Sequence, residues 1–183
     1  MIRRLDDVCQ AVTELPLGHV FAYPTEAVYG LGCDMFHQPA VERILALKDR
    51  PMHKGLIVLI AEWSQLFPLI GDVPLSKLDA IKETWPGPTT WVFPKSSLVP
   101  VWVSGEHPTI AIRMTAHPIA RQLCERGPIV STSANPQGQE PARSLASLDH
   151  MFPVGLDGVV MGALGVELQP SSIFDALTHQ QFR

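Results

Sequence analysis

The run Gly55-Leu56-Ile57-Val58-Leu59-Ile60 is the stretch that decides the fold class. Every residue after the glycine is apolar, which is typical of a strand that is buried on both faces of a sheet. Before it, residues 40–48 place Val41 and Ile44 on one face of a helix, and Pro51 ends that helix because the residue before a proline avoids helical geometry. A helix that leads into a doubly buried strand predicts an α/β fold.

Helices and strands keep alternating on both sides of this unit. Apolar residues at helical spacing begin at Leu5 and stop before Pro16, so the first helix is expected there. Residues 24–32 are rich in proline and glycine and are expected to form a loop. Further helices are expected at 75–85, 119–125 and 144–152, and further strands at 20–23, 89–93, 109–113, 128–131, 159–161 and 171–175. The sequence thus predicts a single α/β domain over residues 1–183 with a twisted, mixed sheet.

Composition excludes several classes of protein. With 46% hydrophobic and 17% charged residues, the chain can build a packed core and is not a charge-driven disordered segment. The 14 lysines and arginines against 18 acidic residues give a net charge of −4, so no overall positive field draws the chain to nucleic acid or to a membrane. The 17 prolines favour short elements joined by fixed turns over a helix bundle.

The N-terminus and the cysteines indicate a cytoplasmic protein. Residues 1–7 lack the apolar stretch of a secretory signal, and no apolar run reaches the roughly 18 residues of a membrane span. Cys9, Cys33 and Cys124 are widely spaced and form no Cys-x-x-Cys pair. Reduced thiols are therefore expected rather than disulfides or zinc ligands.

The densest group of positive side chains lies at the end of the second expected helix. Arg43, Lys48, Arg50 and Lys54 have only one acidic neighbour, Asp49. Cations at a helix C-terminus complement the helix dipole by about 0.3–1 kcal/mol, so a solvated helix end is one interpretation. The other is an anion site, since Lys48 and Arg50 flank a tight turn that leads into a buried strand.

Hydroxyl side chains are concentrated in Ser131-Thr132-Ser133-Ala134-Asn135, which is expected to be a turn directly after the strand at 128–131. Such residues cap helices and turns. Their hydroxyl groups and the backbone N–H groups of a turn also suit phosphate or carboxylate oxygens. From the residues alone, the two interpretations are equally favoured.

Several catalytic motifs are absent from the sequence. It contains no P-loop and no Gly-x-Gly-x-x-Gly, so a standard NTPase or dinucleotide fold is not expected. It contains no His-Glu-x-x-His and no zinc-deaminase signature, so no metal ligands are expected. Gly-x-Ser-x-Gly is missing too, which argues against covalent catalysis by a serine. A nucleotide, if bound, must be bound by other means.

Six motifs, taken in order, resemble one family. They are Tyr23-Pro24-Thr25-Glu26-Ala27-Val28-Tyr29-Gly30-Leu31-Gly32, Lys48-Asp49-Arg50-Pro51, Trp85-Pro86-Gly87-Pro88-Thr89-Thr90, Arg113, Ser131-Thr132-Ser133-Ala134-Asn135 and Pro170-Ser171-Ser172-Ile173. From about residue 20 to the C-terminus, the chain resembles the YrdC/TsaC family of threonylcarbamoyl-AMP synthases in its short, single-domain bacterial form. Lys54-Gly55 and Ser172 depart from the residues common in that family.

The resemblance implies a twisted α/β sheet with a concave, basic cleft. It implies the condensation of L-threonine, bicarbonate or carbon dioxide, and ATP to L-threonylcarbamoyl-adenylate and pyrophosphate. This product would serve N6-threonylcarbamoyladenosine formation in tRNA, with separate transfer proteins as partners. Catalytic positions are matched by Lys48 and Arg50, positions near threonine by Thr25, Arg113, Ser131 and Ser171, and nucleotide-binding positions by Lys48, Met52, Thr109, Ser133, Asn135, Arg143 and Arg183.

The implied chemistry suits these residue types. A carbamate formed from threonine must attack the α-phosphorus of ATP, so two anions have to meet. Cations such as Lys48, Arg50 and Arg113 offset their repulsion, while serine and asparagine side chains orient the reacting groups. Mg²⁺ is expected to arrive with ATP, held by phosphate oxygens and water, with no metal site on the protein.

Two other functions compete with this one. A basic cleft would also suit a maturation factor that binds double-stranded or ribosomal RNA, although the net charge of −4 and the lack of a second basic run disfavour it. A carbamoyl-transfer domain of hydrogenase maturation is disfavoured because 183 residues and three cysteines leave no room for zinc-finger and acylphosphatase segments.

Overall fold

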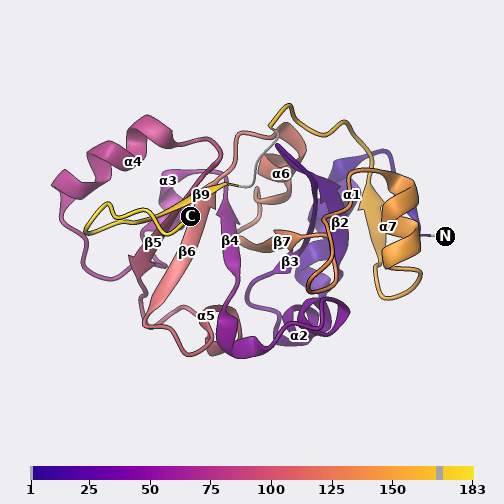
Figure 1. Ribbon diagram of the computed structural model, residues 1–183, viewed down its shortest axis with the longest axis horizontal. Coiled ribbons are helices and arrows are strands. Elements are labelled where there is room, and N and C mark those ends of the chain that lie inside the picture. Colours follow the sequence, from indigo (N-terminus) through magenta and orange to yellow (C-terminus); the bar gives the residue numbers. More distant parts are fainter. Residues whose placement is uncertain (1, 168–170) are drawn as a thin grey trace.

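A mixed sheet runs through the protein. The computed structural model describes residues 2–167 and 171–183, and over these residues nine strands follow the order β1-β8-β2-β3-β7-β4-β6-β5-β9 (Figure 1). The pairs β1–β8, β2–β8, β4–β6 and β5–β9 are parallel, and the other neighbours are antiparallel. The strands are β1 (Arg4–Leu5), β2 (Phe21–Pro24), β3 (Tyr29–Asp34), β4 (Ile57–Ile60), β5 (Thr89–Pro94), β6 (Thr109–Met114), β7 (Ile129–Ser133), β8 (Gly158–Val160) and β9 (Ser172–Asp175).

Short helices connect the strands. They are α1 (Val8–Glu14), α2 (Gln38–Leu47), α3 (Trp63–Leu66), α4 (Leu78–Thr84), α5 (Val101–Ser104), α6 (Pro118–Leu123) and α7 (Leu145–Met151), with 3-10 turns η1 (Leu15–Leu17), η2 (Met52–Lys54) and η3 (Leu75–Lys77). The predicted α/β fold with a mixed sheet is confirmed. The sequence interpretation missed β1, α3 and α5, each of which has four residues or fewer.

The burial pattern of β6 shows how the two faces of the sheet are used. Ile110, Ile112 and Met114 are buried in the largest apolar core, together with side chains of α2, α4 and α5. The alternate residues, Arg113 among them, are half-buried on the opposite face. Because side chains alternate along a strand, β6 supplies core packing and cleft lining at the same time.

The opposite face of the sheet carries a smaller core. Apolar side chains of α1 and α6 pack there with Phe21, Tyr23 and Leu59. Further along this face, β4, β6 and β7 contribute Ile57, Arg113 and Ser131 to the lining of a cleft. A third cluster packs α7 against apolar residues of β2, β3 and β8.

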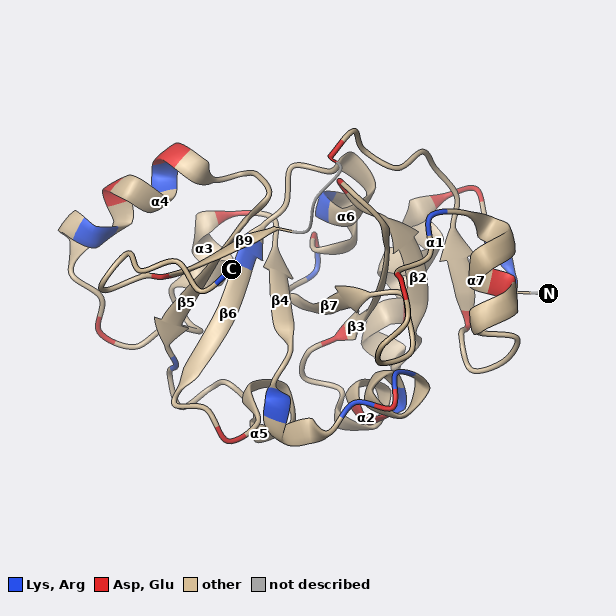
Figure 2. Ribbon diagram, in the orientation of Figure 1, with Lys and Arg blue, Asp and Glu red and all other residues tan. Residues whose placement is uncertain are grey.

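Charged residues avoid the centre of the sheet. Figure 2 shows β4 and β7 without any, as their sequences require. In both described ranges, the helices are too short or too polar for any of them to cross a membrane.

Three predicted boundaries are wrong. Leu5 belongs to β1, and the first helix begins at Val8 with Asp7 as its N-cap. Tyr29–Asp34 is strand β3, so the loop expected at 24–32 is limited to residues 25–28. Ser131–Ser133 continue β7 because β3 pairs with that strand as far as Ser133, whereas β4 pairs with it only as far as Ser131.

The error at β3 has a steric cause. Glycines usually interrupt strands, but a Cβ on Gly32 would lie 2.8 Å from the ring atom Cε1 of Tyr23 and 2.8 Å from the carbonyl oxygen of Val130. A Cβ on Gly30 would also lie close to the same ring, at 3.3 Å. Because Gly30 and Gly32 carry no side chains, they leave space for the ring of Tyr23 against β3. The other predicted elements are confirmed with shifted ends, and Pro170 lies outside the described residues.

Candidate functional site

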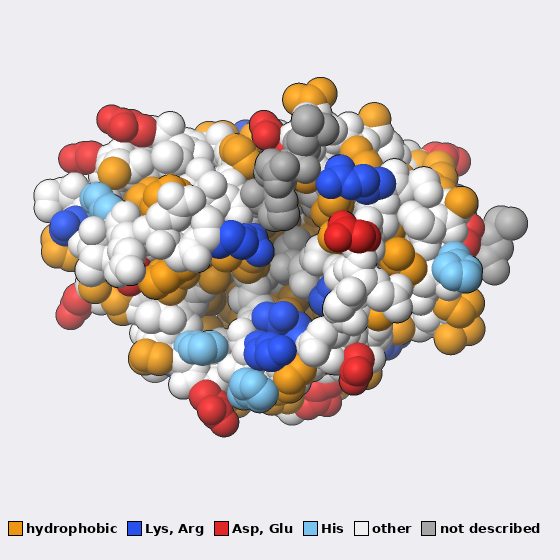
Figure 3. Space-filling model, in the orientation of Figure 1, with side chains coloured by type: hydrophobic (Ala, Val, Ile, Leu, Met, Phe, Trp, Pro, Cys, Tyr) orange, Lys and Arg blue, Asp and Glu red, His pale blue; other side chains and the backbone are white. Residues whose placement is uncertain are grey.

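A cleft of about 1070 Å³ opens on the face of the sheet formed by β4, β6 and β7. Figure 3 shows the hollow between the two halves of the molecule. The turn at 25–28, the loop after α2, the segment at 140–143 and the C-terminal residues complete its walls. The predicted site residues that line it are Thr25, Arg50, Thr109, Arg113, Ser131, Ser133, Arg143, Ser171 and Arg183.

The cleft is more positive than the chain as a whole. Among the described residues, five cationic and three carboxylate side chains line it, a balance of +2, whereas the chain has a net charge of −4. The cations are Arg50, Lys54, Arg113, Arg143 and Arg183, and the carboxylates are Glu26, Glu140 and Glu167. Lysine and arginine side chains border the hollow in Figure 3. A concave surface with this excess of positive charge attracts anionic ligands.

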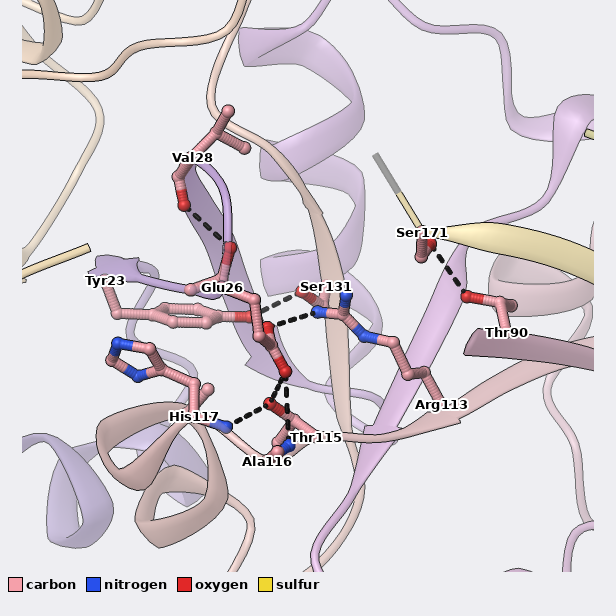
Figure 4. Close-up of polar contacts among 12 residues, drawn as sticks. Tyr23, Glu26, Val28, Thr90, Arg113, Thr115, Ala116, His117, Ser131 and Ser171 are labelled. Atoms are coloured by element: carbon pink, nitrogen blue, oxygen red, sulfur yellow. Dashed lines mark hydrogen bonds and ion pairs between the residues drawn. The ribbon is translucent and has the colours of Figure 1, made fainter. Parts of the chain in front are cut away.

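Ser131 is oriented from behind by Tyr23. The Tyr23 hydroxyl, which is fully buried, donates to Ser131 Oγ at 2.6 Å (Figure 4). Burial raises the pKa of Tyr23 above its ordinary value, so the phenol keeps its proton and remains a donor. Because the serine oxygen accepts this bond, its own proton is available to a ligand in the cleft.

Arg113 forms an ion pair with Glu26 at the wall of the cleft. Arg113 Nη2 lies 3.3 Å from Glu26 Oε2, and each side chain is 12% exposed. Glu26 Oε1 accepts from Thr115 Oγ1 at 2.8 Å and from the backbone N–H of Ala116 at 3.1 Å (Figure 4). Burial acts to raise the pKa of Glu26, but the charge of Arg113 and these hydrogen bonds outweigh it, so the pKa lies below its ordinary value. The carboxylate is therefore ionised at neutral pH.

Hydroxyl groups stand at the ends of two further strands. Thr25, directly after β2, donates its hydroxyl to the carbonyl oxygen of Val28 at 2.7 Å. Ser171, directly before β9, lies 3.0 Å from the hydroxyl of the buried Thr90 (Figure 4). Arg183 is held beside it, since Nη2 of that arginine donates to the carbonyl oxygen of Ser171 at 3.0 Å. The C-terminal residues are thus attached to the cleft wall.

After the end of α2, the side chains of Lys48 and Arg50 point in different directions. Asp49 has a positive φ of 50°, and its N–H bonds to the carbonyl oxygen of Ala46, while the Arg50 N–H bonds to that of Leu45. This pair of bonds is the Schellman pattern that terminates helices with one left-handed residue. Two residues that are close in sequence are thereby separated in space.

Lys48 faces the protein and not the cleft. Its Nζ donates to the carbonyl oxygens of Ser133 and Asn135, and to Asn135 Oδ1 at 3.2 Å. All three ammonium protons are thus engaged, and the residue is 5% exposed. Burial, helped by the charge of Arg50, lowers the pKa of Lys48 to about 8. Lys48 therefore ties the end of α2 to the segment that follows β7.

Arg50 reaches the cleft and is held by the loop around η2. Its Nη2 and Nε donate to the carbonyl oxygen of Gly55 at 2.9 and 3.2 Å. That loop packs backbone to backbone on the end of α5, where a Cβ on Gly105 would lie 2.5 Å from the carbonyl oxygen of His53. The position of Arg50 therefore depends on a contact that only glycine permits.

Three predicted nucleotide-binding residues do not line the cleft. Lys48 and Asn135 lie behind it, with Asn135 Oδ1 accepting from the hydroxyl of Ser133 at 2.6 Å. Met52 lines a smaller, open hollow of about 550 Å³ on the other side of Arg50.

Sequence reasoning also missed site residues. Glu26 and Tyr23 belong to the motif at residues 23–32, but the sequence assigned no role to either residue. Thr115 belonged to no motif, and the signal that could have identified it is a polar residue directly after the strand that carries Arg113.

Comparison with known families gives one match over most of the chain. The profile of the family Sua5/YciO/YrdC, described as telomere recombination, matches residues 14–183. Among curated proteins, the threonylcarbamoyl-AMP synthase of Coxiella burnetii is 44% identical over 98% of this chain and 100% of its own length. That of Pseudomonas paraeruginosa is 49% identical over 91% of this chain and 90% of its own length.

Solved structures agree with this match. The structure of the H234A/Y235A variant of P. abyssi Sua5 superposes with a TM-score of 0.91 at 32% identity. It covers 99% of this chain, which in turn spans 58% of that protein. A complex of P. abyssi Sua5 with L-threonine gives a TM-score of 0.88 at 33% identity, over 96% of this chain and 54% of that one. Escherichia coli YciO, at 23% identity and a TM-score of 0.81, shares the fold.

Proposed function

Because the chain belongs to the Sua5/YciO/YrdC family, we propose that it is a threonylcarbamoyl-AMP synthase. The enzyme condenses L-threonine, bicarbonate or carbon dioxide, and ATP to L-threonylcarbamoyl-adenylate and pyrophosphate. The observation that carries this function is the cleft, which gathers hydroxyl and guanidinium groups from segments that are far apart in the sequence. In this proposal, residues 1–183 act as one YrdC-like domain, and the enzyme works in the cytoplasm.

One part of the cleft is assigned to threonine. Arg113 offers guanidinium donors to the carboxylate of the amino acid. The hydroxyls of Ser131, Thr25 and Ser171 are assigned to its polar groups. The support for this assignment is that Tyr23 leaves the Ser131 proton free to donate, and that all four assigned residues line the same cavity.

Another part of the cleft is assigned to the nucleotide. Arg50, Arg143 and Arg183 bring positive charge there, and Thr109 and Ser133 bring hydroxyl groups. Met52 and Asn135 do not line this cavity, so they are assigned no direct contact with the nucleotide. Mg²⁺ enters as part of the ATP substrate, held by phosphate oxygens and water.

The chemistry joins two anions. The threonine amine adds to bicarbonate with loss of water to give a carbamate, and a carbamate oxygen then attacks the α-phosphorus while pyrophosphate leaves. Arg50 is the proposed catalytic cation, because it lies in the cleft and can stabilise negative charge on the transferring group. Lys48 acts as a positioning residue that holds Ser133 and Asn135 in place.

The product is a mixed anhydride and needs a nucleophile to consume it. We assign it to N6-threonylcarbamoyladenosine formation in tRNA, carried out by separate transfer proteins. The enzyme itself makes no covalent intermediate in this scheme.

The decisive experiment is mass spectrometry of a mixture of the protein, ATP, L-threonine and ¹³C-labelled bicarbonate. The native chain is expected to give ¹³C-labelled threonylcarbamoyl-adenylate together with pyrophosphate, which carries no label. The control variant Arg121→Ala changes an exposed arginine outside the cleft and should give the same products. Arg113→Ala should lose most of the product. No labelled adenylate from the folded native chain would refute the proposal. Salt-dependent binding of duplex RNA without ATP would favour the RNA-binding alternative instead.

A further inference from the structure

Among the described residues, Arg113 has one partner and several unused donors. Within residues 2–167 and 171–183, its ion pair with Glu26 is the one polar contact it makes. Its Nε is buried without a hydrogen-bond partner. Leaving donors of a mostly buried guanidinium unmatched is costly, so the arrangement favours a ligand that supplies acceptors. How well that ligand binds depends on how firmly the guanidinium is aimed.

Glu26 is itself held by a separate segment of the chain. The Thr115 hydroxyl and the Ala116 N–H both donate to Oε1 (Figure 4). Thr115 is fully buried, and its oxygen accepts from the N–H of His117 at 3.2 Å. Gly165 packs on the backbone of Glu26, where a Cβ would lie 2.6 Å from the Glu26 carbonyl oxygen. Both ends of Glu26, backbone and carboxylate, are therefore fixed.

The donors around Glu26 require a carboxylate. Two donors point at Oε1, and Arg113 Nη2 forms an ion pair, but not a hydrogen bond, with Oε2. A glutamine would place its NH₂ group against Arg113 in one orientation, and against the Ala116 N–H in the other. Since only a carboxylate offers an acceptor for the two hydrogen bonds on one side and a negative charge for the ion pair on the other, no amide rotamer keeps all three contacts.

From this geometry we propose that Glu26 and Thr115 are positioning residues that aim Arg113 at the carboxylate of the amino-acid substrate. The inference rests on the proposed function, in which Arg113 binds threonine. Thr115 is buried behind the cleft wall and acts through Glu26, and Glu26 acts through Arg113. The contacts run from Thr115, directly after β6, to Glu26, and from Glu26 to Arg113 within β6.

The test compares two ligands in four proteins. L-Threonine and L-threoninol share an amine and a hydroxyl, but threoninol lacks the carboxylate. Binding of each is measured by calorimetry, without ATP or bicarbonate, to the native chain and to Thr115→Val, Thr115→Ser and Glu26→Gln. Valine keeps the shape of threonine without the donor, and serine keeps the donor, so these two variants are matched controls for each other.

The native chain should prefer threonine by about ten- to a hundredfold, the range expected for hydrogen bonds to a charged group. Thr115→Val and Glu26→Gln should lose most of that preference through weaker threonine binding, with threoninol binding unchanged and the KM for ATP unaltered. Thr115→Ser, which keeps the hydroxyl donor, should keep the native preference for threonine over threoninol. If Glu26 and Thr115 only supported the fold, the variants would weaken the binding of threonine and of threoninol by the same factor.

The outcomes separate the inference from the proposed function. If the native chain does not distinguish the two ligands, Arg113 does not bind the carboxylate, and its proposed role fails together with the inference. If the native preference persists in folded Thr115→Val, the positioning role alone is wrong. Should Glu26→Gln fail to fold, the valine and serine pair at position 115 still decides.

Discussion

Gly105→Ala is expected to damage the protein more than any ordinary surface change, because the contact it disturbs fixes the loop that holds Arg50. Gly105 has φ 61° and ψ −141°, a conformation nearly confined to glycine, and placing another residue there costs about 1–3 kcal/mol. The new Cβ would also lie 2.5 Å from the carbonyl oxygen of His53 and 2.7 Å from that of Met52. Forcing such a contact costs about 1–3 kcal/mol more, because backbone must move.

The expected loss of unfolding free energy is therefore about 2–6 kcal/mol, out of the roughly 5–15 kcal/mol typical of a domain. The backbone of η2 must shift away from Gly105, and the carbonyl oxygen of Gly55 that accepts from Arg50 shifts with it. A displacement of about 1 Å at a catalytic group lowers rates by about a hundredfold. Urea unfolding followed by tryptophan fluorescence measures the first effect, and pyrophosphate release at varied ATP measures the second.

Gly127→Ala is the matched control. Gly127 also has a positive φ, of 153°, but a Cβ there meets nothing within 4 Å, and the residue does not line the cleft. Its alanine variant should lose little stability beyond the backbone cost and no activity. If Gly105→Ala proves as stable as Gly127→Ala and keeps the native rate with ATP, the reasoning about this loop contact is wrong.

Three further expectations can be checked. The lowered pKa of Glu26 means that its contribution to stability is complete above the unfolded pKa of about 4.3 and is lost as pH falls through the folded value. The advantage of the native chain over Glu26→Gln in urea unfolding should thus shrink between pH 6 and pH 3, and a constant difference would contradict this. Tyr23→Phe removes the bond to Ser131 and should cost about 0.5–1.5 kcal/mol, with a raised KM for threonine but not for ATP. With serine in place of threonine, pyrophosphate release should fall by about 10–200-fold, and with valine by about 10⁴-fold; similar rates with valine would mean that the hydroxyl is not recognised.

Strands β4 and β6 could be predicted because their own residues determine them. The apolar run ending in Ile57–Ile60 becomes β4, and the alternation over Thr109–Met114 becomes β6 with its odd residues toward the cleft. In both strands, the order of apolar and polar residues along the segment itself indicates which residues are buried, so the strand can be predicted without knowing its neighbours. The alternation in β6 also explains why Thr109 and Arg113 share one face.

Contacts between distant segments decide the elements that local reading missed. Tyr29–Asp34 contains two glycines and reads as a loop, yet it is a strand because Gly30 and Gly32 pack under the ring of Tyr23. No propensity of residues 29–34 contains that information. The continuation of β7 through Ser133 likewise depends on pairing with β3, since β4 pairs with β7 only as far as Ser131.

The candidate site could be predicted only as a set of residues. The resemblance brought together Thr25, Arg113, Ser131 and Ser171, and these line one cavity. It could not identify Thr115, because the importance of that hydroxyl arises from the carboxylate it meets, 89 residues away in sequence.

The Lys48–Arg50 pair illustrates why residue type alone does not assign a role. On charge, the two cations are equivalent, and both match catalytic positions of the family. The left-handed Asp49 between them turns the chain, so that one ammonium meets the carbonyl oxygens after β7 while the guanidinium reaches the cleft. If Lys48 acts as a tether, Lys48→Met should leave the carbonyl oxygen of Asn135 without a donor among the described residues, while the Ser133 carbonyl oxygen still accepts from the Asn135 N–H, and should lower the unfolding free energy by about 1–3 kcal/mol. Arg50→Ala should instead lower pyrophosphate release by about 10²–10³-fold with little loss of stability. Equal effects of the two variants on stability and on rate would show that the turn does not divide their roles.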